Sequence, residues 1–169
     1  PVAETNPTID EFHLLEGTDW PLEADSTDLV LSDCVLEHLA APDDFFAEAR
    51  RVLRSGGHLC LRTANARSYP ILVSRVIPDD FHSAILGFAQ DDRQEQDVFP
   101  KHYRCNTPEA IEQKFADHDF DGVSYCHEAE PAYLSFSKWA YLLGVLHQKW
   151  MPNRFGPALF GFARAVDAT

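Results

Sequence analysis

Two places along the chain combine a carboxylate with groups that could bind or react. Glu37 and His38 stand side by side after an aliphatic run, and Glu16 precedes Gly17 and Thr18 after another apolar run. An imidazole exchanges a proton near neutral pH, so His38 could orient a substrate or act as a general base. The alternative for His38 is a packing role in a helical turn, with its ring bonded to a nearby backbone group. Both places follow predicted strands, and open α/β sheets bind ligands at that end of their strands.

The cysteines do not indicate a metal site. No two of the four, at positions 34, 60, 105 and 126, have a C-x-x-C spacing, and we expect no bound metal. Buried, reduced thiols are instead typical of a cytoplasmic protein. Residues 1–11 have neither the basic nor the apolar region of a signal peptide, which agrees with that location.

The charge balance excludes several kinds of partner. The chain of 169 residues has 27 acidic and 14 basic side chains, which gives a formal net charge of −13. Such a surface argues against DNA or bulk RNA and disfavours an anionic membrane surface. The most apolar stretch, residues 133–147, is interrupted by polar residues and is too short to span a bilayer, so we expect no integral membrane segment. This stretch leaves room for a lipid-like acceptor or for peripheral membrane contact.

Strands and helices alternate along the chain. Apolar runs predict a buried strand at residues 28–35 and further strands at 11–16, 58–64, 123–127 and 158–165. Helical spacing and capping residues such as Pro42 and Thr107 predict a turn at 36–39 and helices at 42–54, 108–118 and 135–149. The order predicts one α/β domain with a mostly parallel sheet and helices on both faces. Residues 66–106 lack strong periodicity, which predicts a functional lid.

Residues 20–65 carry a run of motifs in a fixed order. A Trp-Pro-Leu turn, an Asp-Leu-Val strand, a Leu-Glu-His-Leu turn and a helix ending in Arg-Val-Leu-Arg-Ser-Gly-Gly stand at residues 20–22, 28–30, 36–39 and 51–57. Together they resemble the class I S-adenosylmethionine-dependent methyltransferases of the group called methyltransferase type 11. His102-Tyr103-Arg104, the helix at Thr107-Pro108 and a final strand ending in Arg164 extend the resemblance over roughly residues 10–165.

The resemblance implies a fold, a cofactor and a reaction. The fold is a Rossmann-like α/β sheet, the cofactor is S-adenosyl-L-methionine, and the reaction is methyl transfer to an acceptor that we expect to be a small molecule. It places cofactor contacts at Glu16, Gly17, Thr18, Ser32, Asp33, Cys34 and Glu37. It gives the acceptor pocket to Tyr69, His82, His102, Tyr103 and Arg104, and His38 beside this site is the candidate catalytic base. A solvated turn residue at Glu16 and a capping role for Asp33 are the alternatives.

The chain departs from that family at its start. The family's first strand and its Gly-x-Gly-x-Gly loop have no counterpart, because none of the eight glycines forms that loop. We therefore expect a partial sheet without its first two strands, in an N-terminally truncated single domain spanning residues 1–169. Strand 28–35 would then be an exposed apolar edge through which the chain could self-associate. The alternative function is a non-catalytic domain of this fold that serves as a binding or partner subunit.

Overall fold

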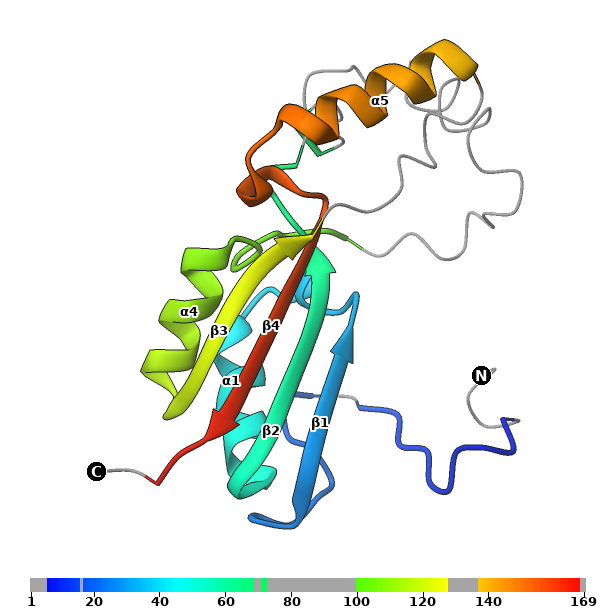
Figure 1. Cartoon of the computed structure of the whole chain (residues 1–169). Coiled ribbons are helices and arrows are strands. Elements are labelled where there is room, and N and C mark those ends of the chain that lie inside the picture. The colour runs from blue at the N-terminus through cyan, green and yellow to red at the C-terminus, as the bar shows by residue number, and fades with distance from the viewer. Residues whose placement is uncertain (1–5, 16, 69–70, 73–99, 128–136, 168–169) are drawn as a thin grey trace.

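The computed structural model describes residues 6–15, 17–68, 71–72, 100–127 and 137–167. The elements in these ranges are, in chain order, β1 (Thr27–Asp33), the 3-10 turn η2 (Leu36–His38), α1 (Pro42–Val52), β2 (Leu53–Ala64), α4 (Pro108–Asp117), β3 (Phe120–His127), α5 (Lys138–Trp150), the 3-10 turn η5 (Asn153–Phe155) and β4 (Ala158–Ala165) (Figure 1). Within the described ranges, every helix is too short or too polar to cross a membrane.

The strands form one four-stranded sheet in the order β1-β2-β4-β3. β1 and β2 run parallel, with Ser32 opposite Leu61 and Asp33 opposite Arg62. β4 runs antiparallel to both of its neighbours, β2 and β3. In the described part of the chain β1, β2 and β3 therefore share one direction and β4 alone is reversed, so the partial Rossmann-like sheet is mixed and the expectation of a mostly parallel sheet is met only in part. The parallel pair β1–β2 still sets the carboxyl ends of two strands side by side.

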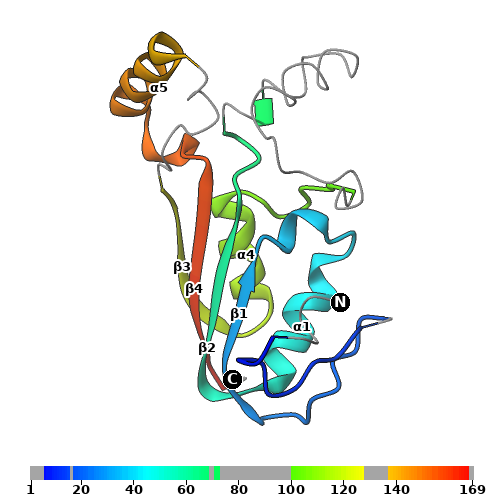
Figure 2. The same cartoon turned by 90° about the vertical axis from the view of Figure 1, so that its right-hand side faces the viewer.

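Helices α1 and α4 pack on the same face of the sheet (Figure 2). Side chains alternate between the two faces along a strand, so Leu59 of β2 and Leu159 of β4 face these helices and are buried. Phe46 from α1 and Phe115 from α4 meet in the core, with ring centroids 6.0 Å apart. The expectation of helices on both faces is not met in the described part of the chain. The opposite face there carries exposed apolar side chains, which are Leu29, Leu31, Val123, Tyr125 and Phe162.

Local sequence explains where the two packed helices begin. α1 starts at Pro42, and its first turn holds two aspartates near the positive end of the helix dipole. α4 starts at Pro108, where the Thr107 hydroxyl accepts a hydrogen bond from the Ala110 N–H at 3.3 Å. β4 can approach α4 closely because it has a glycine there: a Cβ atom at Gly161 would lie 3.0 Å from the Phe115 ring. Both helix predictions are confirmed.

The segment before β1 does not form the predicted strand. Residues 11–15 are irregular, and Glu16 lies outside the described residues. Leu14 is 72% exposed, and within the described ranges β1 is an edge strand with no neighbour on its outer side. A strand cannot form without a partner that takes its hydrogen bonds. The expected burial of strand 28–35 is wrong, since Leu31 is 71% exposed on the face that no described helix covers, whereas the expected apolar edge is confirmed.

Candidate functional site

The carboxyl ends of β1 and β2 meet a segment from later in the chain. β1 ends at Asp33, and the chain turns at Cys34, whose φ of 55° lies in the left-handed region. The Cys34 N–H donates to the Arg62 carbonyl of β2 at 2.8 Å, so the turn is tied to the neighbouring strand. η2 follows directly, and residues 100–106 lie against it. The predicted site residues Ser32, Asp33, Cys34, Glu37 and His38 therefore share one end of the sheet with part of the predicted lid.

Asp33 is held by an arginine on the neighbouring strand. Arg62 donates from Nε to Asp33 Oδ1 at 2.5 Å and from a terminal nitrogen to Oδ2 at 2.6 Å. This guanidinium holds the pKa of the Asp33 carboxyl below its usual range, so Asp33 is ionised at neutral pH. Burial, followed by the Asp33 carboxylate, raises the pKa of the Cys34 thiol. Cys34 is therefore a neutral thiol and a poor nucleophile.

Glu37 is buried in a polar network that the sequence did not predict. Glu37 is only 6% exposed, and its Oε2 accepts a hydrogen bond from the Thr63 hydroxyl at 2.6 Å. Asn106 donates from Nδ2 to the Thr63 hydroxyl oxygen at 2.7 Å and to the Ala64 carbonyl at 3.1 Å. One hydroxyl therefore connects the end of β2, the η2 turn and the loop before α4.

Backbone contacts fasten the loop onto η2 beside His38. The Glu37 carbonyl accepts hydrogen bonds from the N–H groups of His102 at 2.7 Å and Tyr103 at 3.2 Å. His38 Nδ1 lies 2.8 Å from the Pro100 carbonyl oxygen. A carbonyl only accepts, so Nδ1 carries the proton and the neutral ring has its lone pair on Nε2. The packing alternative for His38 has the backbone contact that it requires, and the same contact fixes the tautomer that a general base needs.

The structure does not bring every predicted site residue to this cluster. Gly17 and Thr18 are exposed in a loop that is tied to α1, where the Trp20 N–H donates to Glu48 at 2.8 Å. Arg104 is exposed and follows the fastened residues 102–103. Glu16, Tyr69 and His82 lie outside the described residues, as does most of the predicted lid, residues 69–70 and 73–99. The roles given to all these residues stay predictions.

Two buried polar atoms near this end of the sheet have unused hydrogen-bonding capacity. Ser32 is 6% exposed and Asn106 is 1% exposed. Among the described residues, neither Ser32 Oγ nor Asn106 Oδ1 has a hydrogen-bond partner. A buried polar atom without a partner costs free energy, so such atoms often mark a place where a ligand or ordered water binds.

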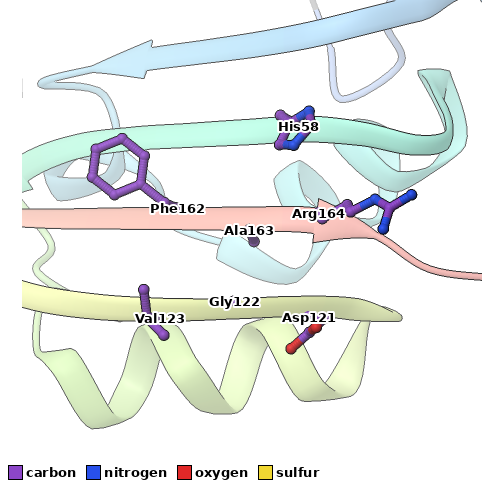
Figure 3. Close-up of a pocket in the computed structure, with 7 residues that line it drawn as sticks. All are labelled: His58, Asp121, Gly122, Val123, Phe162, Ala163 and Arg164. Atoms are coloured by element: carbon purple, nitrogen blue, oxygen red, sulfur yellow. The ribbon is translucent and has the colours of Figure 1, made fainter.

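Two shallow hollows lie on the open face of the sheet. One, of about 260 Å³, borders the candidate site and is lined by Leu31, Asp33, Cys60, Arg62 and Phe162, among others. The other, of about 290 Å³, lies between β2, β4 and β3, where Figure 3 shows His58, Arg164 and Asp121 around it. His58 stands at the opposite end of the β1–β2 pairing from Asp33, so the second hollow is not part of the candidate site.

Sequence comparison finds proteins that are similar to parts of the chain. A family model described as a methyltransferase domain matches residues 2–61. An uncharacterized 37.1 kDa protein in a transposon of Streptomyces fradiae is 54% identical over 41 residues, which are 24% of this chain and 12% of that protein. The chain therefore spans a small part of this curated relative.

Solved structures share the fold at low sequence identity. A chain in the complex of the Haloferax volcanii Trm112 methyltransferase activator with its candidate methyltransferase has a TM-score of 0.55 at 18% identity, covering 90% of this chain and 59% of its own. The [4+2]-cyclase SpnF has a TM-score of 0.51 at 13% identity, with coverages of 94% and 56%. A SAM-dependent methyltransferase of Thermotoga maritima, described as a possible histamine N-methyltransferase, has a TM-score of 0.50 at 12% identity, with coverages of 87% and 59%. This chain thus spans less than two thirds of each of these structures.

Proposed function

We propose that this chain is part of a longer enzyme that transfers a methyl group from S-adenosylmethionine to a small-molecule acceptor; the match of residues 2–61 to a methyltransferase domain and the shared fold support this. One observation supports this most: the carboxyl ends of β1 and β2 hold His38 on η2, with residues 102–103 fastened to the same turn. An imidazole of fixed tautomer beside a loop that can shape a pocket is what proton removal from an acceptor requires.

Two polar atoms at this end of the sheet could form hydrogen bonds with such a cofactor. Ser32 Oγ can still donate to or accept from a ligand and Asn106 Oδ1 can still accept, because no described residue bonds to either atom. We assign the methionine portion to Ser32, Asp33, Cys34 and Glu37, and the adenine ring to Glu16, Gly17 and Thr18. When bound, the cofactor supplies an electrophilic methyl group on a sulfonium ion.

The residues of this chain would position the acceptor and remove its proton. His38 accepts that proton at Nε2, while the Pro100 carbonyl holds the opposite ring nitrogen. The Thr63–Glu37 hydrogen bond keeps η2 in place and thereby keeps the imidazole at the end of the strands. His102, Tyr103 and Arg104 shape the acceptor pocket. Positioning of this kind supplies most of the rate in a displacement at a reactive methyl group.

The fold by itself does not decide the reaction. The [4+2]-cyclase SpnF has the same fold, and its name describes a different chemistry. A test of the proposal must therefore measure cofactor binding and methyl transfer directly.

Calorimetric titration with S-adenosylhomocysteine tests the proposal, first on this chain and then on the longest natural protein that contains it. Micromolar binding by the longer protein, with transfer of a labelled methyl group to a screened acceptor, would support it. The matched variants are Gly17→Val and His38→Ala. A Cβ atom at Gly17 meets nothing within 4 Å, so Gly17→Val should keep the fold and weaken binding if adenine packs there. His38→Ala should leave affinity unchanged and slow transfer by about 10²-fold or more.

The results of these binding and transfer experiments distinguish an enzyme from a non-catalytic partner subunit. A folded longer protein that does not bind S-adenosylhomocysteine would contradict the proposal and favour a non-catalytic role. Binding that requires the longer protein would show that the site is completed by residues outside this chain.

A further inference from the structure

Helix α5 (Lys138–Trp150) turns an apolar stripe away from the rest of the protein. Trp139, Leu143, Leu146 and Trp150 recur at helical spacing and are 75%, 67%, 52% and 81% exposed. On the opposite side of the helix, Gly144 is buried and Tyr141 is half-buried. At about 100° per residue these two sets lie roughly half a turn apart. The largest apolar side chains of the helix are therefore exposed on one side, while Gly144 and Tyr141 on the other side are wholly or partly covered.

The stretch of sequence that contains α5 differs in charge from the whole chain. The net charge is −13, yet no acidic residue occurs in the sequence between Glu130 and Asp167. The same stretch has three basic residues in or just after α5, Lys138, Lys149 and Arg154, whereas Arg164 lies at the far end of β4. Both lysines of α5 are exposed. Charges more than about 8–10 Å apart are screened in physiological salt. The lysines on α5 therefore affect its binding more than the net charge of the whole chain does.

α5 lies at the same end of the molecule as the candidate site (Figure 1). The link from α5 to β4 is fixed to the end of β2, because Asn65 donates from Nδ2 to the Arg154 carbonyl at 2.9 Å and to the Gly156 carbonyl at 2.8 Å. The Asn65 N–H also donates to the Pro157 carbonyl at 2.9 Å. A membrane or protein that bound α5 would therefore lie at the end of the molecule where β2 ends.

We propose that α5 docks this end of the protein onto a lipid bilayer that contains anionic headgroups. Trp139, Leu143, Leu146 and Trp150 enter the interface, and Lys138 and Lys149 reach the headgroups. The features fit an interfacial helix: an exposed apolar stripe, tryptophans near both ends and lysines beside it. Charge complementarity favours a lipid surface over a second copy of this chain, because the same basic face on two copies would repel.

Sedimentation with lipid vesicles tests the docking on the 169-residue chain. One set of vesicles contains phosphatidylcholine alone, and the other adds phosphatidylglycerol. We expect binding to the mixed vesicles that weakens as salt is raised, with a blue shift of tryptophan fluorescence. Leu143→Gln should weaken binding about tenfold, since the leucine is lost from the interface. Removing both lysines, as Lys138→Gln with Lys149→Gln, should weaken it about fivefold per lysine.

The control is Leu14→Gln, because Leu14 is as exposed as the stripe residues but lies far from α5 in the sequence. It should bind vesicles as the unchanged chain does, and a cooperative melt of every variant confirms that each is folded. The proposal is overturned if the folded chain does not bind the mixed vesicles, or if the α5 variants bind as well as Leu14→Gln. It is also overturned if light scattering shows a dimer that Leu143→Gln dissociates and vesicles do not bind.

Discussion

At the scale of single residues, the Thr63 hydroxyl is the link on which the candidate site depends. It donates to the buried Glu37 carboxylate and accepts from Asn106. Thr63→Val keeps the shape and removes the donor, which leaves a buried carboxylate and a buried amide each short of a partner. We expect the free energy of unfolding to fall by about 1–3 kcal/mol in urea titration. The matched control is Thr27→Val on β1, where the side chain is only half-buried and the loss should be smaller. Equal losses would mean that the network does not hold η2.

The tautomer of His38 is a second prediction at this scale. The Pro100 carbonyl requires a proton on Nδ1, whereas an imidazole in water favours the proton on Nε2. Long-range ¹H–¹⁵N NMR spectra above neutral pH should therefore show one histidine with a protonated Nδ1 and a lone pair on Nε2. This signal should vanish in His38→Gln and persist in His13→Gln, whose exposed ring contacts Glu11. A His38 ring protonated on Nε2 would contradict the geometry and remove the proposed base.

Sequence patterns located the neighbourhood of the site but not its buried network. The Leu-Glu-His-Leu turn led to Glu37 and His38, because charged residues directly after a strand stand out. Thr63 and Asn106 were missed, since their roles depend on which strands and loops meet. A signal for Thr63 was present: the alternation that turns Leu59 and Leu61 inward also turns Thr63 inward, and a buried hydroxyl needs a partner.

At the scale of elements, Glu48 and Arg51 tie the loop before β1 to α1. Glu48 accepts from Arg51 at 2.7 Å and from the Trp20 N–H at 2.8 Å, and Arg51 also donates to the Trp20 carbonyl at 3.0 Å. The Arg51 guanidinium, followed by the Trp20 N–H, lowers the pKa of Glu48 to about 2. A carboxyl whose pKa is lower in the folded state stabilises the fold above its unfolded pKa, and this contribution is lost as pH falls through the folded value.

Glu48→Gln should therefore destabilise the protein most near neutral pH. Because Arg51 is 37% exposed and solvent screens the pair, we expect a loss of about 1–2 kcal/mol. The difference from the unchanged protein should shrink as pH falls from about 4.5 towards about 2. Urea unfolding at a series of pH values measures this. Arg51→Gln should show the same pH dependence, and the double variant should lose less than the sum of the two. A pH-independent difference would count against the ion pair.

Helices and strands could be predicted from the sequence where neighbouring residues determine their starts and ends. Pro42 and the Thr107-Pro108 pair fixed the starts of α1 and α4, and the alternation over 158–165 gave β4 its bounds. The segment at 11–16 had the residue types of a strand and failed, because a strand exists only beside a partner. The sequence made no prediction of the direction of β4, since pairing between strands distant in sequence leaves no local pattern.

At the scale of the whole molecule, the described sheet is covered by helices on one face only (Figure 2). Tyr125, Phe160 and Phe162 stack on one another on the other face, with neighbouring ring centroids 5.6–6.5 Å apart. Apolar faces of this kind are normally covered in a folded protein. The edge at β1 adds backbone groups that can pair with another strand. Both features lead to the same expectation for the chain in isolation.

We predict that the isolated chain self-associates through β1 and that Leu31→Lys weakens this association. Leu31 is 71% exposed on the edge strand, and a lysine there adds a charge that a strand-to-strand contact would have to bury. The dissociation constant of the dimer should rise about tenfold or more, which corresponds to the loss of one buried leucine. Sedimentation equilibrium over a range of concentrations measures this constant. Leu14→Lys, with Leu14 72% exposed away from the sheet, should leave it unchanged. A chain that stays monomeric at every concentration would show that the edge is protected in solution.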